Sequence, residues 1–313
     1  MVELRTVTER DILALRGPRN PVDSSRPYLW FTERERTTEG RIEEVAAIFL
    51  TNKECPFRCV FCDLWKNTTK DRVPPGAVAG QVDFALAQSP GARHIKLYNS
   101  GNFFDDQAVS QCDRLRIRDV LSGFRTVIVE CHPKLVDRRC VEFAGGLAAA
   151  LQVGMGLETV DPHVLPRLNK RMTLDDFARA TEFLLAHGIA VRAFIMLRTP
   201  YQSEEEGVEW AQRSIDFAFS IGVECCSVVP ARAGNGVMER LQEQGHFHPP
   251  SLRSMERVLE YGVGLRRGRV FMDLWDLERS YTCGVCGPAR GERLAAINLS
   301  QPVPPRISCV CGS

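Results

Sequence analysis

Short apolar runs that alternate with helix-like stretches are the feature of this chain that most limits its possible folds. Six such runs lie at 45–51, 94–100, 126–131, 151–158, 190–197 and 223–230. Continuous runs of this length, without strict alternation of polar and apolar residues, are typical of strands buried on both faces of a parallel sheet. We therefore predict a parallel sheet whose strands are connected by helices.

Helical patterns fill the intervals between the later runs. They cover 74–89, 133–147, 173–188 and 203–222. The last two begin with the expected N-caps Thr173 and Ser203, each followed three positions later by an acidic residue, and they end at Gly188 and Gly222. Six strands that alternate with helices predict a βα repeat.

The length of this repeat favours one α/β fold over another. A closed eight-stranded barrel usually needs ~250 residues, so we predict an α/β fold with a partial (β/α)6 barrel that resembles a TIM barrel. A doubly wound open sheet remains an alternative. We divide the chain into an N-terminal extension, the barrel, a connecting helix and strand (251–266 and 269–275), and a cysteine-rich metal site, at 1–42, 43–232, 233–282 and 283–313.

Cysteine content restricts the function further. The chain of 313 residues has 12 cysteines, and its N-terminal sequence MVELRTVTERDILALRG contains no apolar signal-peptide core. No apolar run approaches the ~20 residues that span a bilayer. We therefore expect a cytoplasmic protein without a membrane partner, in which clustered cysteines bind metal. The net charge of +1 neither predicts nor excludes a nucleic-acid partner.

The first cysteine group directly follows the first apolar run. Cys55, Cys59 and Cys62 have the spacing Cys-x3-Cys-x2-Cys. Three thiolates at this spacing can hold one face of an iron–sulfur cluster. With no fourth cysteine nearby, one iron keeps an open position for a small chelating molecule, as in catalytic zinc sites. The alternative is a structural zinc site with a distant fourth ligand.

This loop, placed after a first strand, resembles the radical S-adenosylmethionine (SAM) superfamily, whose members share a partial (β/α)6 barrel. The resemblance implies that Cys55, Cys59 and Cys62 are the catalytic centre and bind a [4Fe–4S] cluster, with Phe61 in the usual aromatic position before the third cysteine. In this superfamily the reduced cluster cleaves SAM to a 5′-deoxyadenosyl radical, which abstracts hydrogen from a substrate. An electron donor such as flavodoxin or ferredoxin is the implied partner.

Motifs after the second run extend the resemblance to SAM binding. In this superfamily a glycine-bearing motif after the second strand meets the methionine amino group of SAM, and glycine permits that close approach. The matching segment LYNSGNF contains no Gly-Gly-Glu, so we assign it this SAM-binding role only from its position after the second strand. It supplies Asn99, Ser100, Gly101 and Asn102.

Later strand ends supply further candidates for cofactor binding. Glu130 in TVIVECHPKLV and Glu158 in QVGMGLETVDPHVLPRLNKRMTLDD match positions in related enzymes, where Glu158 would bind the ribose or the methionine moiety. AFIMLRTP (193–200) matches the fifth-strand position that packs on adenine, and Arg198 at its end is a candidate contact for a carboxylate or phosphate. The resemblance covers residues 26–230 in all.

Two segments indicate a branch of the superfamily. DLWKNTT (63–69) and YNSGNFFD resemble the branch that contains the archaeosine-synthesis radical enzyme and the elongator catalytic subunit, both of which act on tRNA. No basic RNA-binding module is evident, so a tRNA substrate is one possibility. The alternatives are radical modification of a small metabolite or peptide, and a non-catalytic iron–sulfur electron-transfer module.

A second cysteine group lies near the C-terminus as Cys-x2-Cys and Cys-x-Cys. Cys283, Cys286, Cys309 and Cys311 form a closed four-thiolate set that suits zinc or an iron–sulfur cluster. We favour an auxiliary [4Fe–4S] cluster slightly, because enzymes of this superfamily often carry one in C-terminal extensions. The other cysteines lie in predicted helices or strands, where we expect small buried side chains; they are Cys112, Cys131, Cys140, Cys225 and Cys226.

Overall fold

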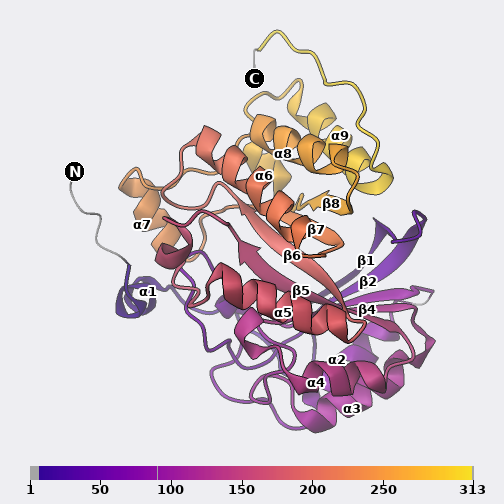
Figure 1. Ribbon diagram of the computed structural model, residues 1–313. Coiled ribbons are helices and arrows are strands. Elements are labelled where there is room, and N and C mark those ends of the chain that lie inside the picture. Colours follow the sequence, from indigo (N-terminus) through magenta and orange to yellow (C-terminus); the bar gives the residue numbers. More distant parts are fainter. Residues whose placement is uncertain (1–6, 90, 312–313) are drawn as a thin grey trace.

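One eight-stranded sheet forms the centre of the protein in the computed structural model, which describes residues 7–89 and 91–311 (Figure 1). The strands are β1 (Leu29–Arg36), β2 (Ile42–Phe49), β3 (His94–Tyr98), β4 (Thr126–Glu130), β5 (Ala150–Glu158), β6 (Ala190–Leu197), β7 (Cys225–Pro230) and β8 (Arg269–Met272). Their order in the sheet is their order in the chain, and only β1 is antiparallel to its neighbour.

This topology confirms the predicted partial barrel. The six apolar runs form β2 to β7, and the consecutive strand order excludes a doubly wound sheet, in which the order reverses at a switch point. β1 was not predicted, because its sequence LWFTERER carries alternating charges. It adds to β2 from within the predicted N-terminal extension, and β8 adds to β7, so one sheet crosses the predicted segment boundaries.

Helices cover the outer face of the curved sheet (Figure 1). They are α2 (Ala77–Leu86), α3 (Gln111–Val120), α4 (Arg138–Gly145), α5 (Leu174–Ala186), α6 (Glu204–Ser220) and α8 (Leu252–Gly264). The other described helices are α9 (Gly287–Ser300), at the edge of the sheet, and α1 (Glu9–Leu15) and α7 (Val237–Glu243), which pack against each other beside the cysteine loop. Thr173 and Ser203 form the predicted capping boxes of α5 and α6. None of the described helices combines the length and apolar character that a membrane span requires.

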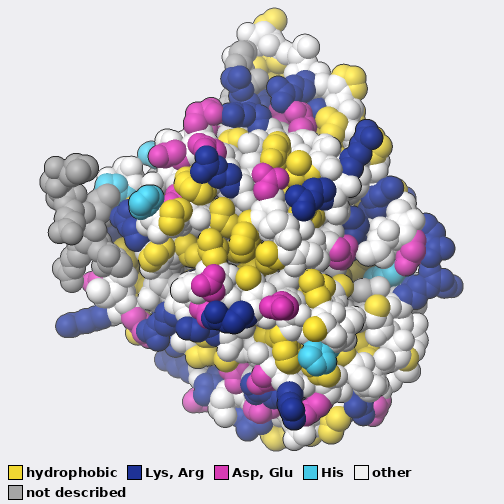
Figure 2. All heavy atoms as spheres, in the orientation of Figure 1, with side chains coloured by type: hydrophobic (Ala, Val, Ile, Leu, Met, Phe, Trp, Pro, Cys, Tyr) yellow, Lys and Arg dark blue, Asp and Glu magenta, His cyan; other side chains and the backbone are white. Residues whose placement is uncertain are grey.

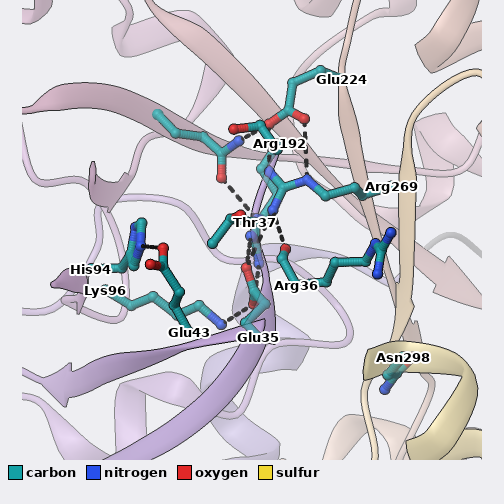
Figure 3. A network of polar contacts seen from close by, with 12 residues as sticks. Glu35, Arg36, Thr37, Glu43, His94, Lys96, Arg192, Glu224, Arg269 and Asn298 are labelled. Atoms are coloured by element: carbon teal, nitrogen blue, oxygen red, sulfur yellow. Dashed lines mark hydrogen bonds and ion pairs between the residues drawn. The ribbon is translucent and has the colours of Figure 1, made fainter. Parts of the chain in front are cut away.

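The interior of the barrel contains a buried ionic network (Figure 3). Glu35 of β1 lies between Lys96 of β3 and Arg192 of β6, with oxygen–nitrogen distances of 2.5 Å to each. Burial alone would raise the pKa of Glu35, but the charges of Arg192 and Lys96 outweigh it and hold the pKa well below its usual range. Glu35 pairs in register with Glu43 near the start of β2, and Arg192 is the third residue of β6, so this network lies toward the amino ends of the parallel strands.

Helix α9 covers the seam between the two edge strands. The side-chain amide of Asn298 accepts from the Met272 amide (2.9 Å) and donates to the Met272 carbonyl (2.8 Å). Gln301 makes the equivalent pair with Val270, at 3.1 and 2.9 Å. Arg269 of β8 donates to the carbonyl of Arg36 in β1 (2.7 Å). Backbone groups of β8 that would otherwise lie unpaired at the sheet edge are thereby satisfied.

We expect Glu35→Gln to lower the free energy of unfolding by about 3–5 kcal/mol, because it leaves buried cations without their shared carboxylate. Denaturant unfolding followed by circular dichroism measures this change. The contribution should disappear as the pH falls below the usual carboxyl range, because the folded-state pKa of Glu35 is depressed. Glu39→Gln is the control: its ion pair with Arg41 is exposed, and we expect a change within about 0.5 kcal/mol. A similar small change for Glu35→Gln would contradict the prediction.

Candidate functional site

The three-cysteine loop leaves the sheet at the carboxyl end of β2. The Leu50 amide donates to the carbonyl of Tyr98 at the end of β3 (2.7 Å), so the loop begins beside the LYNSGNF segment. Farther along, the Val60 amide donates to the carbonyl of Leu168 (2.9 Å), and Cys62 closes a turn onto the carbonyl of Cys59 (3.2 Å). The loop therefore lies at the rim where active sites of βα barrels form.

Two asparagines that sequence reasoning missed hold this loop in place. The Asn235 amide donates to the carbonyls of Val60 (2.6 Å) and Cys62 (3.2 Å), and its side chain is 2% exposed. The Asn169 amide donates to the carbonyl of Arg58 (2.6 Å). The one available signal for Asn235 was its place in the glycine-rich segment 232–236, which breaks the βα pattern.

Gly101 and Asn102 lie directly against the first cysteine. A Cβ atom at position 101 would stand 3.0 Å from the Cβ of Cys55, so this close approach favours glycine. The Asn102 amide nitrogen lies 3.3 Å from the Cys55 sulfur, and its oxygen accepts from the amide of His132. The ring of His132 in turn stacks on Phe57 within the cysteine loop, with ring centres 3.7 Å apart.

Glu130 organises the turn that follows β3. Its carboxylate accepts from the backbone amide of Asn99 (3.0 Å) and also from those of Ser100 and Gly101. Burial raises the pKa of Glu130 to about 7 even though these amides favour the charged form. Ser100 adopts a left-handed backbone conformation (φ 55°), which turns successive amides toward the carboxylate. Asn99 is fully buried, and neither polar atom of its side chain has a partner among the described residues.

Glu158 forms a buried ion pair that sequence reasoning did not anticipate. Its Oε1 lies 2.5 Å from Nζ of Lys170, and both side chains are less than 10% exposed. A Cβ atom at Gly156 would collide with both groups, so the glycine leaves the room that the pair occupies. Lys170 also lies 5.9 Å from the ring centre of Phe61. The carboxylate is therefore engaged by a cation, and that cation lies next to the cysteine loop.

The three thiols of the loop lie in surroundings whose burial raises the pKa of each of them. Burial raises the pKa of Cys59 to about 12 and that of Cys62 well above its usual value, so a cation that binds these sulfurs must displace their protons. Among the described residues, only the C-terminal cysteines bring three or more ligand atoms within 4.8 Å of one another. Cys55, Cys59 and Cys62 do not form such a compact group in the structure.

Arg198 lies away from these groups. Its guanidinium forms an ion pair with Glu204 at the start of α6 and donates to the carbonyl of Pro249 (2.7 Å). The residue has a left-handed backbone (φ 58°), and a Cβ atom at Gly207 would stand 2.8 Å from the Arg198 Cα. The structure thus places Arg198 at the junction of β6 and α6, already paired with an acidic group.

The concave face of the sheet remains accessible near this rim. Phe49, Tyr98, Phe194 and Ser227 are half-exposed, whereas the neighbours of each in its strand are buried under the helices. Three of these residues belong to a chain of aromatic contacts that runs from Trp275 through Phe31. The ring centres lie 6.4 Å (Trp275–Phe31), 5.9 Å (Phe31–Phe49), 5.3 Å (Phe49–Tyr98) and 6.4 Å (Tyr98–Phe194) apart.

The remaining cysteines divide into a metal-binding group and isolated residues. The sulfurs of Cys283, Cys286, Cys309 and Cys311 all lie within 4.8 Å of one another, as the spacing predicts for a metal site. The expectation that the other cysteines are buried is correct for four of them: Cys131, Cys140, Cys225 and Cys226. It is wrong for Cys112, which α3 exposes while its neighbours Asp113 and Arg114 face inward.

Comparison with known families identifies the class of protein. The family described as the radical SAM superfamily matches residues 50–213, more than half of the chain. The protein belongs to the radical SAM superfamily, as the Cys55 loop predicts. Membership supports an enzyme whose cofactors are a [4Fe–4S] cluster and SAM.

Individual relatives place the chain more closely. It is 22% identical to an uncharacterized protein of Methanocaldococcus jannaschii, over 92% of this chain and 86% of the relative. It is 26% identical to archaeosine synthase subunit beta of Methanosarcina acetivorans, over 66% of this chain but only 63% of that subunit. This match confirms the predicted branch. The crystal structure of methylornithine synthase shares the fold, with a TM-score of 0.54 at 13% identity, over 95% of this chain and 82% of that one.

We expect Glu130 to make stability fall as the pH rises from about 4.5 to about 7. Its folded-state pKa is raised, so in this window the folded chain holds a proton that the unfolded chain has released. Glu130→Gln should remove up to about 3 kcal/mol of this pH dependence, measured by anaerobic denaturant unfolding across the window. Glu142→Gln, which changes an exposed residue of α4, should keep the wild-type profile. Parallel profiles for wild type and Glu130→Gln would refute the assignment.

Proposed function

We propose that this chain binds a [4Fe–4S] cluster through Cys55, Cys59 and Cys62 and cleaves SAM reductively. When bound, the reduced cluster supplies the electron that converts SAM to methionine and a 5′-deoxyadenosyl radical, which abstracts hydrogen from the substrate. The observation that carries the proposal is the place of these cysteines, on a loop that leaves the carboxyl end of β2 and lies against the Asn99–Asn102 turn, in a chain of this superfamily. A flavodoxin or ferredoxin is the expected electron donor.

Residues around the loop have distinct proposed roles in this reaction. Gly101 and Asn102 position Cys55, and Asn102 donates toward its sulfur. The buried, unpartnered amide of Asn99 is available to the polar groups of SAM, in a turn that Glu130 fixes. The positive charge of Lys170 lies close to the cysteine thiols and would offset negative charge on the ligated cluster.

A small apolar cluster shields the loop from the outside. Ile12 of α1 and Met238 and Phe247 of the segment around α7 are each at most 2% exposed and pack in one cluster with Val60 of the cysteine loop. α1 also contacts α7 directly, since a Cβ atom at Gly236 would collide with the carbonyl of Leu15. We propose that this cover excludes water and oxygen from the cluster, as radical chemistry requires.

For the substrate we propose a base of an RNA. The archaeosine synthase match supports this class, although the chain spans only 63% of that subunit. The half-exposed aromatic rings on the concave face suit a planar base, because stacking on aromatic side chains is the usual way that proteins hold an unpaired base. On the face in Figure 2, Lys and Arg side chains are interspersed with Asp and Glu, so no broad basic field carries this proposal.

We expect anaerobically reconstituted protein to bind about four irons at the Cys55 loop and to form 5′-deoxyadenosine with dithionite and SAM. Cys59→Ala should abolish that product and the loop's iron, whereas Cys112→Ala, which changes an exposed cysteine of α3, should preserve both. Product chromatography and iron analysis measure the two quantities. A Cys59→Ala protein that still forms 5′-deoxyadenosine would disprove the assignment. A cluster spectrum that SAM leaves unchanged would favour an electron-transfer module.

A second experiment tests the RNA substrate. Trp275→Ala should leave 5′-deoxyadenosine formation without substrate intact but lower product formation on bulk tRNA about tenfold to hundredfold, since base stacking is worth ~1–3 kcal/mol. Mass spectrometry of nucleosides from treated tRNA measures the product. Leu115→Ala removes another exposed apolar side chain, on α3, and should behave as wild type. Unaltered tRNA together with consumption of a small metabolite would overturn the RNA proposal.

A further inference from the structure

The C-terminal cysteines converge from both ends of helix α9. Cys283 and Cys286 precede the helix, and Cys286 is its N-cap residue. Cys309 and Cys311 return from the segment that follows it. The sulfurs of Cys283 and Cys309 lie 4.0 Å apart, those of Cys286 and Cys311 lie 3.6 Å apart, and all four lie within 4.8 Å of one another.

These separations match ligands of a single ion. Metal–sulfur bonds of ~2.3 Å in a tetrahedron place the sulfurs about 3.8 Å apart. In a [4Fe–4S] cube each cysteine binds a different iron, so the sulfur–sulfur separation also includes an iron–iron distance and is larger. The geometry therefore favours the zinc alternative over an auxiliary cluster. We propose that these four cysteines bind one Zn²⁺ in a closed site that fastens the C-terminal segment to α9.

Hydrogen-bond donors around the four cysteines can offset the negative charge of such a site. Four thiolates with one Zn²⁺ carry a net charge of −2, and hydrogen bonds to the ligands stabilise it. The backbone amides of Val285 and Cys286 donate to the Cys283 sulfur. Arg290, one turn into α9, contacts the Cys286 sulfur and also lies 2.8 Å from Glu256 of α8, with 4% of its surface exposed. The site is thus linked to α8 as well as to α9.

The same segment is held along its length by α8 and α9. Arg293 of α9 donates to the carbonyl of Pro304 (2.7 Å) and pairs with Glu260 of α8 (2.8 Å). Arg306 pairs with the same carboxylate at 2.6 Å. At the other end of α9, Asn298 hydrogen-bonds the edge of β8. A metal at the start of α9 therefore stabilises the helix that closes the barrel seam (Figure 1).

Metal analysis of intact, anaerobically prepared protein tests the identity of the ion. We expect about one zinc per chain beside the iron. Cys309→Ser combined with Cys311→Ser should remove that zinc and leave the iron content unchanged, while leaving β8 and α9 unaltered in sequence. Cys112→Ser should keep both metals. Loss of about four irons in the double variant would establish an auxiliary cluster. Loss of one iron would establish a mononuclear iron site, and absence of zinc from the wild type would also overturn the proposal.

Amide hydrogen exchange tests the fastening role, independently of SAM chemistry. We expect the double variant to exchange about tenfold faster or more in α9 and β8 than wild type, since their opening free energy falls by at least ~1.4 kcal/mol. Peptides from α4, which connects β4 and β5 in the middle of the sheet order, should be unchanged. The variant should still form 5′-deoxyadenosine, so loss of the proposed radical chemistry and loss of zinc are separate outcomes. Equal exchange rates in α9 would refute the fastening role.

Discussion

The parallel direction of seven neighbouring strands is the constraint on which the rest of the structure depends. Parallel strands bring their carboxyl ends to one rim, so segments separated by more than 100 residues in the chain meet there. The cysteine loop after β2, the turn after β3 and Glu158 at the end of β5 lie together for this reason. Toward the opposite end, the carboxylate of Glu35 is shared by two buried cations, Lys96 and Arg192. The ionic network and the cysteine loop thus lie toward opposite ends of the parallel strands.

Much of this organisation was visible in the sequence, because parallel strands buried on both faces leave continuous apolar runs. The same rule explains why β1 was not predicted. Its sequence has no continuous apolar run, because Glu33 and Glu35 point into the barrel toward Lys96 and Arg192. At the site, the cysteines were singled out by their spacing, and the Asn99–Asn102 segment by its position in the resemblance to the superfamily. Lys170 and Asn235 could not, because their roles depend on long-range contacts with Glu158 and with the cysteine-loop carbonyls. Arg198 is the opposite case. Its position at the end of a strand suggested a contact with a ligand, but its guanidinium already pairs with Glu204 at the start of the next helix.

The two cysteine groups show how geometry distinguishes sites of identical chemistry. Both consist of thiols close in sequence, and neither spacing alone fixes the metal. At the rim three cysteines lie on a loop whose carbonyls accept hydrogen bonds from Asn169 and Asn235, and three ligands would leave one coordination position of a bound cluster open. Near the C-terminus four sulfurs crowd around a single point and leave no such position. The first arrangement suits chemistry on a ligand, and the second suits mechanical support.

The side-chain amides that cover β8 have a consequence for how such barrels diversify. A closed ring of paired strands has a circumference set by strand number and stagger, and altering it requires every register to change. Here the ring is completed by Asn298 and Gln301 on a helix, with Arg269 reaching the backbone of β1. Substitutions in this one helix can therefore change the distance between β1 and β8, and with it the width of the barrel, without altering any pairing between strands. A barrel closed in this way can change its internal width, and so the size of the molecule it holds, while the loops at the carboxyl ends of its strands stay the same.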